Sequence, residues 1–584
     1  MPRSRHSAPA ATFLLCALPL LFAPQLSFGA ALNVSVDGLD GALRDNVLAS
    51  LSIYQERQRA DLFPARIRRL HERAPEEIRT ALQPFGYYRP RIEATLRQNG
   101  EQWTAQYRVE PGPPLPVAAV DVNLAGDGAD DPAFRALVED FPIKRGDTLN
   151  HAVYENAKQR FQAVAAERGY FDLRFTRQEV RVDLEAYRAE IQLAVDTGPR
   201  YRFGQVTIDQ EILSPELLAR YVQLHPGQPY STAALLDAQL ALLGSNYFSD
   251  VQIEADPERA ENYAVPVHVQ VTPRPPNKYT FGIGYGTDTG GRGQIGWERY
   301  YLNPRGHHTR VELRGSRIEN SVTAGYFIPI RNPRTDQLAL TGGYNELETR
   351  VFTSQIRRLA VSRTTTRGHL LETLSVTHQR EEFEIGTQQQ TTTLILPGVS
   401  WTYYLGEERI YTRRGARLLL DLRGASEELG SDVSVGQARF QTRVILPVFE
   451  FSRLIARGEI GSTRIGEFQD LPASLRFFAG GDLSVRGYAY NTLGPTDAEG
   501  NVIGGPYLLV GSVEYEQHIT GNWAAAVFYD AGNALNDFND PLARGAGIGL
   551  RWRSPIGQVR VDAASALSDP GQPWRIHLYI GPDL

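Results

Sequence analysis

The strongest constraint on the fold is a pattern that begins at Asn277 and continues to the last residue, Leu584. Apolar or aromatic residues alternate there with polar residues or glycine, as in the run from Tyr279 to Gly286. A period of two residues is typical of β-strands, because successive side chains face opposite sides of a sheet. More than half of this 584-residue chain is therefore predicted to form strands with one apolar and one polar face.

A short N-terminal segment indicates that the chain is exported. Arg3 and Arg5 precede an apolar stretch over residues 10–22, and small residues follow at 29–31, which together form the pattern of a secretory signal peptide over residues 1–30. The single cysteine, Cys16, lies inside that stretch. The mature protein is therefore expected to have no disulfide, no thiolate nucleophile and no cysteine-bound metal.

Alternating strands in an exported chain suit either a soluble sandwich or a barrel in an outer membrane. No apolar run of 18 residues follows residue 31, so no membrane-spanning helix is predicted. Residues 277–584 divide into about 16 strands at roughly 19 residues per strand and connection. Short turns are predicted at residues 303–306, 332–334, 364–368, 407–415, 447–452, 519–522 and 554–557. We therefore predict a 16-stranded antiparallel outer-membrane β-barrel with both ends on the short-turn, periplasmic side.

The region before the barrel is predicted to form three small α+β domains, over residues 31–114, 115–199 and 200–276. In each, a helical stretch leads to an aromatic corner, and a later strand runs into a proline-rich stop. Each domain is expected to have the order β-α-α-β-β. The edge strands of such small sheets can accept a strand from another chain, although the domains could also serve only as spacers.

One predicted connection, from about Phe468 to Tyr507, is far longer than the others and has no alternation. Connections of that length are usually functional or disordered, and the many aromatic and glycine residues here favour a packed loop. Two later strands carry the acids Glu514 and Asp530 on the parity that faces the lumen. We expect Arg486 of the loop to fold into the lumen and pair with one or both carboxylates, since a guanidinium can bind two acids at once.

These residues resemble the outer-membrane insertase superfamily that includes BamA and TamA. Its members have a row of POTRA domains, then a barrel whose sixth extracellular loop carries a V-R-G-F/Y motif that meets G-x-x-E and F-x-D-x-G motifs on the strands. Three POTRA domains resemble the TamA type, whereas BamA has five. The matching residues are Val485, Arg486, Gly487 and Tyr488 in the loop, Gly511 and Glu514 in one strand, and Phe528, Asp530 and Gly532 in the next.

The resemblance implies a role in inserting or secreting outer-membrane proteins, autotransporters in particular, within a translocation and assembly module. It also implies a large periplasmic TamB-like partner, client outer-membrane proteins and the lipid bilayer as partners. Glycines in the first barrel strand are expected to weaken its pairing with the last strand, so that a seam can open there. The expected seam residues are Gly282, Gly284 and Gly286 on the first strand and His577 and Tyr579 on the last. The register between the two strands stays open, so Thr280 and Gly282 are each candidates to face His577 or Tyr579.

Three other functions remain open from the sequence: a two-partner secretion transporter that threads its client through the lumen, a passive porin with spacer domains, and an outer-membrane dock for a TamB-like protein that moves phospholipid. The net charge of -6 and the presence of only three lysines disfavour nucleic acid as a partner. Residues 291–296 match a dinucleotide fingerprint, but they lie in a predicted strand without a following helix. The sequence therefore predicts no enzyme, no metal and no cofactor.

Overall fold

The computed structural model describes residues 31–59, 61–406, 412–554 and 557–581. The predicted signal peptide with Cys16 lies outside these residues, as do parts of the turns predicted at 407–415 and 554–557. The chain forms two compact units. The first contains the chain up to Arg202 together with Pro229–Thr232, and the second contains Phe203–Gln228 and the chain from Ala233 onward.

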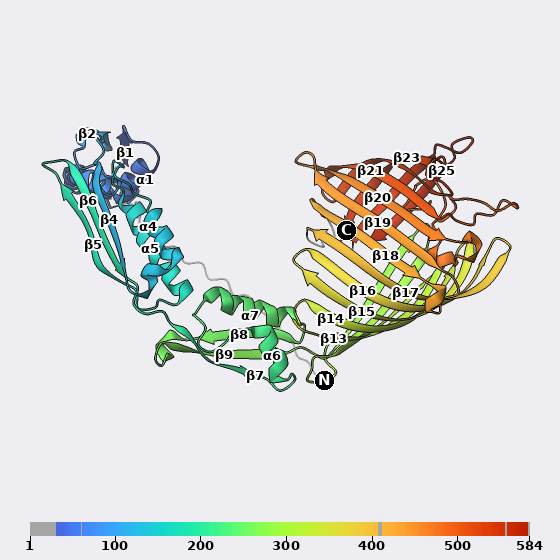
Figure 1. The fold of residues 1–584 in the computed structure, drawn as a ribbon. Helices are drawn as coiled ribbons and strands as arrows, with labels where there is room; N and C mark the ends of the chain where they lie inside the picture. The colour runs from blue at the N-terminus through green and yellow to red at the C-terminus, as the bar shows by residue number, and fades with distance from the viewer. Residues whose placement is uncertain (1–30, 60, 407–411, 555–556, 582–584) are drawn as a thin grey trace, which may run out of the picture. The chain divides into compact units, whose positions relative to one another are not determined.

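The first unit holds two small domains, each a three-stranded sheet covered by helices (Figure 1). The sheet orders are β1-β3-β2 and β4-β6-β5, so the third strand of each domain is central, the first strand lies parallel to it, and the first and second strands form the edges. The first domain contains β1 (Ala31–Asp37), α1 (Gly41–Ser50), α2 (Ser52–Gln55), α3 (Pro64–Leu82), β2 (Arg91–Asn99) and β3 (Gln102–Glu110). The second contains β4 (Val117–Ala125), α4 (Pro132–Glu139), α5 (His151–Arg168), β5 (Arg174–Asp183) and β6 (Arg188–Asp196).

Each of these sheets buries one face against its helices. Strand β3 shows the alternation clearly, because Trp103, Ala105, Tyr107 and Val109 are buried and the residues between them are exposed. These four side chains pack against Ile67, Leu70, Ala74 and Ile78, which recur along one side of α3 at helical spacing. The period-two strand and the helical stripe therefore produce one core per domain.

The second unit begins with a third domain of the same design, with sheet order β7-β9-β8. It contains β7 (Arg202–Asp209), α6 (Pro215–Val222), α7 (Thr232–Gly244), β8 (Phe248–Ala255) and β9 (Ala264–Pro273). Ser214 caps α6 through a hydrogen bond from the Leu217 amide to its hydroxyl group. Among the described residues, no helix is both long and apolar enough to cross a membrane.

The rest of the second unit is a closed barrel of sixteen strands, each antiparallel to its neighbours. The predicted fold, three small α+β domains before a 16-stranded barrel, is therefore confirmed; the first domain differs from the predicted β-α-α-β-β order by one additional short helix, α2. The strands are β10 (Asn277–Gly286), β11 (Gly290–Arg299), β12 (His308–Ser316), β13 (Glu319–Pro329), β14 (Asp336–Glu348), β15 (Phe352–Arg367), β16 (Leu370–Ile385), β17 (Gln388–Leu405), β18 (Gly415–Ala425), β19 (Val435–Pro447), β20 (Ser452–Ile465), β21 (Tyr507–Thr520), β22 (Trp523–Leu535), β23 (Ala543–Ser554), β24 (Gly557–Ala566) and β25 (Trp574–Gly581).

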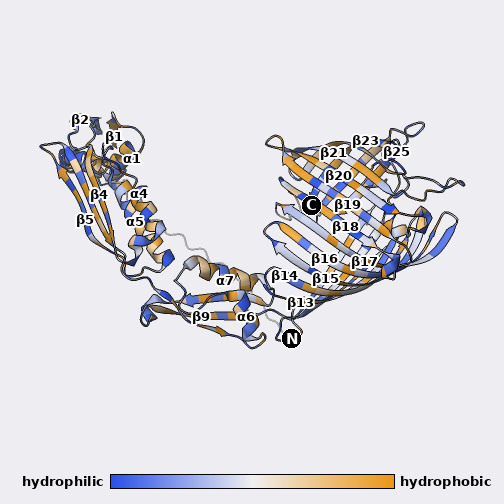
Figure 2. Cartoon of the chain, viewed as in Figure 1, coloured by the Kyte–Doolittle hydropathy of each residue, from blue (hydrophilic) through white to orange (hydrophobic). Residues whose placement is uncertain are grey.

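Figure 2 shows hydrophobic and hydrophilic residues alternating along the barrel strands. The outward side chains are apolar and exposed, for example Phe281, Ile283 and Ile548, while polar side chains face the lumen. The residues that spell a dinucleotide fingerprint lie inside β11, which is followed by another strand and not by a helix. The longest connection joins β20 to β21; we call residues 466–506 loop 6.

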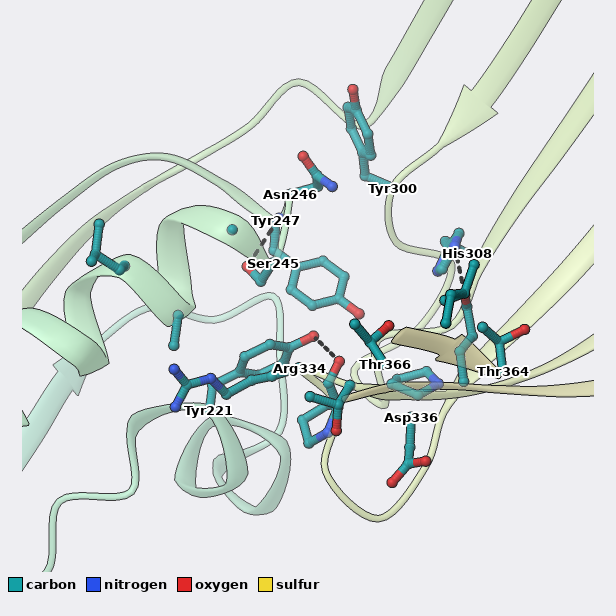
Figure 3. Close-up of a pocket in the computed structure, with 18 of the residues that line it drawn as sticks. Tyr221, Ser245, Asn246, Tyr247, Tyr300, His308, Arg334, Asp336, Thr364 and Thr366 are labelled. Carbon is teal, nitrogen blue, oxygen red and sulfur yellow. Dashed lines mark hydrogen bonds between the residues drawn. The ribbon is translucent and has the colours of Figure 1, made fainter. Parts of the chain in front are cut away.

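The third domain rests on the rim formed by the short turns of the barrel. The Tyr247 hydroxyl donates a hydrogen bond to the Gly306 carbonyl oxygen at 2.6 Å, and the Tyr221 hydroxyl donates to that of Pro333 at 3.3 Å. Figure 3 shows both tyrosines directed toward this rim, beside a cavity of about 630 Å³. Arg334 of the β13–β14 turn forms a bidentate ion pair with Asp237 of α7, at 2.6 and 2.8 Å. The domain nearest the barrel therefore has a defined seat on it.

Candidate functional site

Loop 6 folds into the barrel and is held there by local backbone structure. It contains two short 3-10 turns and three isolated β-bridges, among them Phe477–Gly505 and Ala479–Leu493. Gly487 has a φ of +99°, and a Cβ atom there would lie 3.0 Å from the backbone of Ser565 and Ala566 on β24. The glycine of the loop motif is therefore required both by its conformation and by the close approach of the loop to the wall.

The side chain of Arg486 is 2% exposed and lies among acids of the lumen wall. Its Nε and Nη2 atoms donate to the two carboxylate oxygens of Asp530 at 2.7 and 2.9 Å, and its Nη1 atom donates to Glu514 at 2.6 Å. The guanidinium carbon lies 3.4 Å from the centre of the Phe528 ring. The structure thus brings Arg486 together with both acids that the sequence indicated, and it gives Phe528 a contact with the same group.

Two further charged groups complete this cluster, and the sequence analysis missed them. Asp562 of β24 accepts a hydrogen bond from Arg486 at 3.1 Å. Arg551 of β23, fully buried, bonds to Glu514 at 2.8 Å and to Asp562 at 2.5 Å. Both residues lie on the lumen parity of adjacent strands, so the signal that found Glu514 and Asp530 could have found them too. A shared set of partners leaves each buried charge compensated.

The remaining motif residues support the loop in different ways. Val485 and Tyr488 are buried beside Ala543 and Ala566, and the Tyr488 hydroxyl donates to the Arg544 carbonyl oxygen at 3.3 Å. Gly532 lies where a Cβ atom would come within 2.8 Å of the neighbouring strand. Gly511 has nothing within 4 Å of such an atom, and the structure gives no packing reason for it.

Loop 6 also contacts the opposite wall of the barrel. The Ser474 amide donates to Glu381 of β16 at 2.9 Å, and the Phe478 ring stacks on Phe352 of β15 with 5.2 Å between ring centres. Arg476, missed by the sequence analysis, is buried and donates to the loop carbonyl oxygens of Leu471 and Gln469, both at 2.8 Å. Because its two ends dock on different walls, the loop crosses the lumen.

The barrel closes through very little strand pairing between β10 and β25. Gly286 and Tyr579 form the single ladder pair between these strands in the described part of the chain, whereas β10 pairs with β11 along its whole length. Next to that pair, the Thr287 amide donates to the Leu578 carbonyl oxygen at 3.0 Å. The outward residue Ile283 of β10 is 91% exposed. Most of β10 therefore has no described residue of β25 paired with it, and we call the junction of β10 and β25 the seam.

The structure sets the register of this seam, which the sequence left open. Tyr579 lies opposite Gly286, and His577 lies beyond the end of β10, so neither faces Thr280 or Gly282. The ladder pair lies at the C-terminal end of β10, next to the hairpin turn. The last strand is therefore displaced by several residues from a register in which Tyr579 would face Thr280 or Gly282. Gly286 and Gly284 are crowded by Thr289 and Arg292, respectively, whereas a Cβ atom at Gly282 would meet nothing closer than 3.6 Å. Because the long Arg292 side chain can move aside, crowding accounts for Gly286 and not for Gly284 or Gly282.

Comparisons with known proteins agree with this geometry. Residues 302–582 match the model of the Omp85 superfamily domain, residues 33–111 match the POTRA domain named TamA domain 1, and residues 201–274 match a POTRA model described as a surface antigen variable number repeat.

Two curated relatives are both outer membrane protein assembly factors BamA. The one from Neorickettsia risticii is 24% identical over 464 residues, which cover 74% of this chain and 61% of the relative. The one from Nitratidesulfovibrio vulgaris is 34% identical over 99 residues, covering 16% of this chain and 12% of the relative. The chain thus spans about three fifths of the length of the first and much less of the second.

Among solved structures, BamA from Haemophilus ducreyi lacking POTRA domains 1–3 superimposes with a TM-score of 0.67 at 16% identity, covering 80% of this chain and 99% of that one. This likeness bears on the fold, namely POTRA-type domains followed by a barrel of the same architecture. The matched barrel and POTRA models identify the chain as a member of the Omp85 superfamily.

Proposed function

We propose that this protein is a TamA-like assembly factor of the outer membrane, which helps to insert or secrete outer-membrane proteins such as autotransporters. In this proposal the barrel spans the outer membrane of a Gram-negative cell, with the POTRA domains and the C-terminus on the periplasmic side. The work is done by strand pairing at the seam and requires no chemical step and no cofactor.

The observation that carries the proposal is the sparse pairing of β10 with β25. Among the described residues this pairing is limited to Gly286 and Tyr579, so most backbone N–H and C=O groups on that side of β10 have no described β25 residue paired with them. In a bilayer such groups are costly, because lipid offers no hydrogen bonds. A client strand that pairs with this edge forms backbone hydrogen bonds that satisfy the unpaired N–H and C=O groups of both chains. This pairing lowers the free-energy cost of inserting the client and needs no ATP.

Loop 6 favours the seam over a threaded or porin-like lumen. A client or solute that passed through the barrel would have to displace the loop from Glu381 on one wall and from the cluster around Arg486 on the other. Breaking a buried ion pair of this kind costs about 3–5 kcal/mol. A lateral route leaves these contacts intact.

A disulfide across the seam tests the proposal. Cysteines at Gly286 and Tyr579 would lie opposite each other in the ladder, where Cα atoms are about 4.5–5.5 Å apart and within disulfide reach. We expect the oxidised variant to form a normal barrel that no longer assembles autotransporter clients, and the reduced form to keep activity. The matched control is a disulfide between Ser362 and Ser375, which face each other on β15 and β16 far along the ladder from the seam.

The result that would contradict the proposal is full client assembly by the oxidised Gly286–Tyr579 variant. In that case, passage of clients across the membrane would favour a two-partner secretion transporter that threads them through the lumen. Passage of small solutes alone would favour a passive porin. Loss of activity in both disulfide variants would indicate a general effect of cross-linking and would also count against the seam.

The proposed periplasmic partner is a large TamB-like protein that meets the first POTRA domain. The domain's strands β1 and β2 are the edges of its sheet, and such edges can accept an added strand. Deleting residues 31–113 should abolish capture of the partner while the barrel still assembles. Retained capture would move the contact to another part of the chain.

A further inference from the structure

The tip of loop 6 contacts both sides of the seam through one residue, Asp482. Its backbone amide donates to the carboxylate of Asp288, in the turn that follows β10, at 2.6 Å. Its own carboxylate lies 2.6 Å from the Nδ1 atom of His577 on β25. Asp288 and His577 are 7% and 2% exposed, so these are buried contacts.

The neighbouring Gly487 fixes the protonation of His577. Its amide donates to the Nε2 atom of the imidazole at 2.9 Å, so Nε2 carries no proton and Nδ1–H donates to Asp482. Asp288, Asp482 and His577 have ligand atoms within 4.8 Å of one another, a spacing that could suit a metal. Because Nδ1 is occupied by its proton, the hydrogen-bonded arrangement explains the cluster without an ion.

These contacts are similar in number to the direct bonds between the first hairpin and the last strand. The direct bonds are the Gly286–Tyr579 ladder pair, two hydrogen bonds between Thr287 and Leu578, and a bond from Arg292 to the Ile580 carbonyl oxygen. An ion pair of 3.7 Å between Arg575 and Asp288 is the weakest of the set. A substantial share of what joins the first hairpin to the last strand therefore passes through loop 6.

We propose that Asp482 is a positioning residue that clasps the seam: it ties the first hairpin and the last strand to loop 6, so that movement of the loop tip frees the outer end of β10. This inference deepens the proposed function, since it assigns the control of seam opening to loop 6. In this view a client that displaces the tip from Asp288 and His577 releases both seam strands together.

Hydrogen exchange of the full chain in lipid nanodiscs tests the clasp without any client. In the Asp482→Ala variant, the Thr287 and Leu578 amides, which bond across the seam, should exchange about tenfold faster. The reason is that the His577 ring and the Asp288 backbone amide both lose the Asp482 carboxylate as their acceptor, although the backbone amide of residue 482 can still donate to Asp288. A His577→Ala variant removes the other end of the same contact and should have a similar effect, measured on the Thr287 amide.

Ser474→Ala is the matched control, because it loosens loop 6 on the opposite wall, at Glu381 and Gln379, and touches neither seam strand. It should leave seam exchange unchanged. Unchanged exchange in Asp482→Ala, or an equal increase in Ser474→Ala, would overturn the clasp. The clasp is proposed to hold only the seam, so the other strand pairs of the barrel should not depend on Asp482. An Asp482→Ala variant that fails to form a heat-resistant barrel would therefore overturn the clasp as well.

The clasp and the proposed function can fail separately. If Asp482→Ala speeds amide exchange at the seam but the oxidised Gly286–Tyr579 variant still assembles clients, the clasp is supported and the proposed assembly of clients at the seam is wrong. If exchange is unchanged while the disulfide stops assembly, the clasp alone is wrong.

Discussion

Replacing Arg486 with alanine should undock loop 6 while leaving the barrel closed. The substitution removes the hydrogen bonds of the guanidinium to Asp530, Glu514 and Asp562. The strand ladder does not depend on them, because β21, β22 and β23 stay paired along their lengths. The change therefore acts on the loop and on the buried acids that it leaves behind.

The cost can be assigned to one of those acids. Glu514 and Asp562 both keep Arg551, at 2.8 and 2.5 Å. Asp530, fully buried, keeps only the Arg486 backbone amide at 3.0 Å, a Ser512 contact and Arg457 at 3.9 Å. Leaving a buried charge without its partner costs about 3–5 kcal/mol, and the remaining contacts favour the lower end. A cost of about 3 kcal/mol corresponds to about 150-fold in the docking equilibrium.

Hydrogen exchange of the Val485–Tyr488 amides measures this docking directly, and heat-modifiable migration checks the barrel. The Arg486→Ala variant should exchange about 150-fold faster in these amides with unchanged migration. Adding Asp530→Asn should recover part of the protection, since it removes the buried charge. An exchange increase below tenfold in Arg486→Ala would refute the assignment to Asp530. So would a double variant whose change in docking free energy equals the sum of the changes in the two single variants.

Two further predictions concern other parts of the second unit. Arg476→Gln should expose the first half of loop 6 to protease, because the guanidinium holds the Leu471, Gln469 and Ile503 carbonyl oxygens; unchanged cleavage there would refute this role. The hydrogen bond from Arg334 holds the pKa of Asp237 below its usual value. The ion pair should therefore stabilise the contact between the third domain and the barrel at any pH above the ordinary carboxylate pKa, and this stabilisation should be lost as the pH falls through the lowered pKa of Asp237. Asp237→Asn should then increase exchange in the 331–335 turn at neutral pH, by a modest amount for an exposed pair, and should make no difference in strong acid; a difference that persists in acid would show that charge is not the cause.

The sequence alone determined the architecture and three of the five charged groups in the lumen cluster. Period-two alternation is a local property, so the strands, their faces and the acids Glu514 and Asp530 on the lumen parity could all be read from neighbouring residues. The same local reasoning indicated that Arg486 would reach these acids, because a long loop with a packed composition must dock somewhere. Asp562 and Arg551 lay within reach of this reasoning and were overlooked.

The tertiary structure alone decided the register of the seam and the contacts at the tip of loop 6. Which residue of β25 faces β10 depends on the stagger with which the whole barrel closes, and a shift along the strands changes every pair without altering the alternation of either strand. That is why Gly286 meets Tyr579 and why His577 meets Asp482 instead of Thr280 or Gly282. Asp288, Asp482 and His577 come from segments separated by 194 and 95 residues, and only closure of the barrel around its loop brings them together.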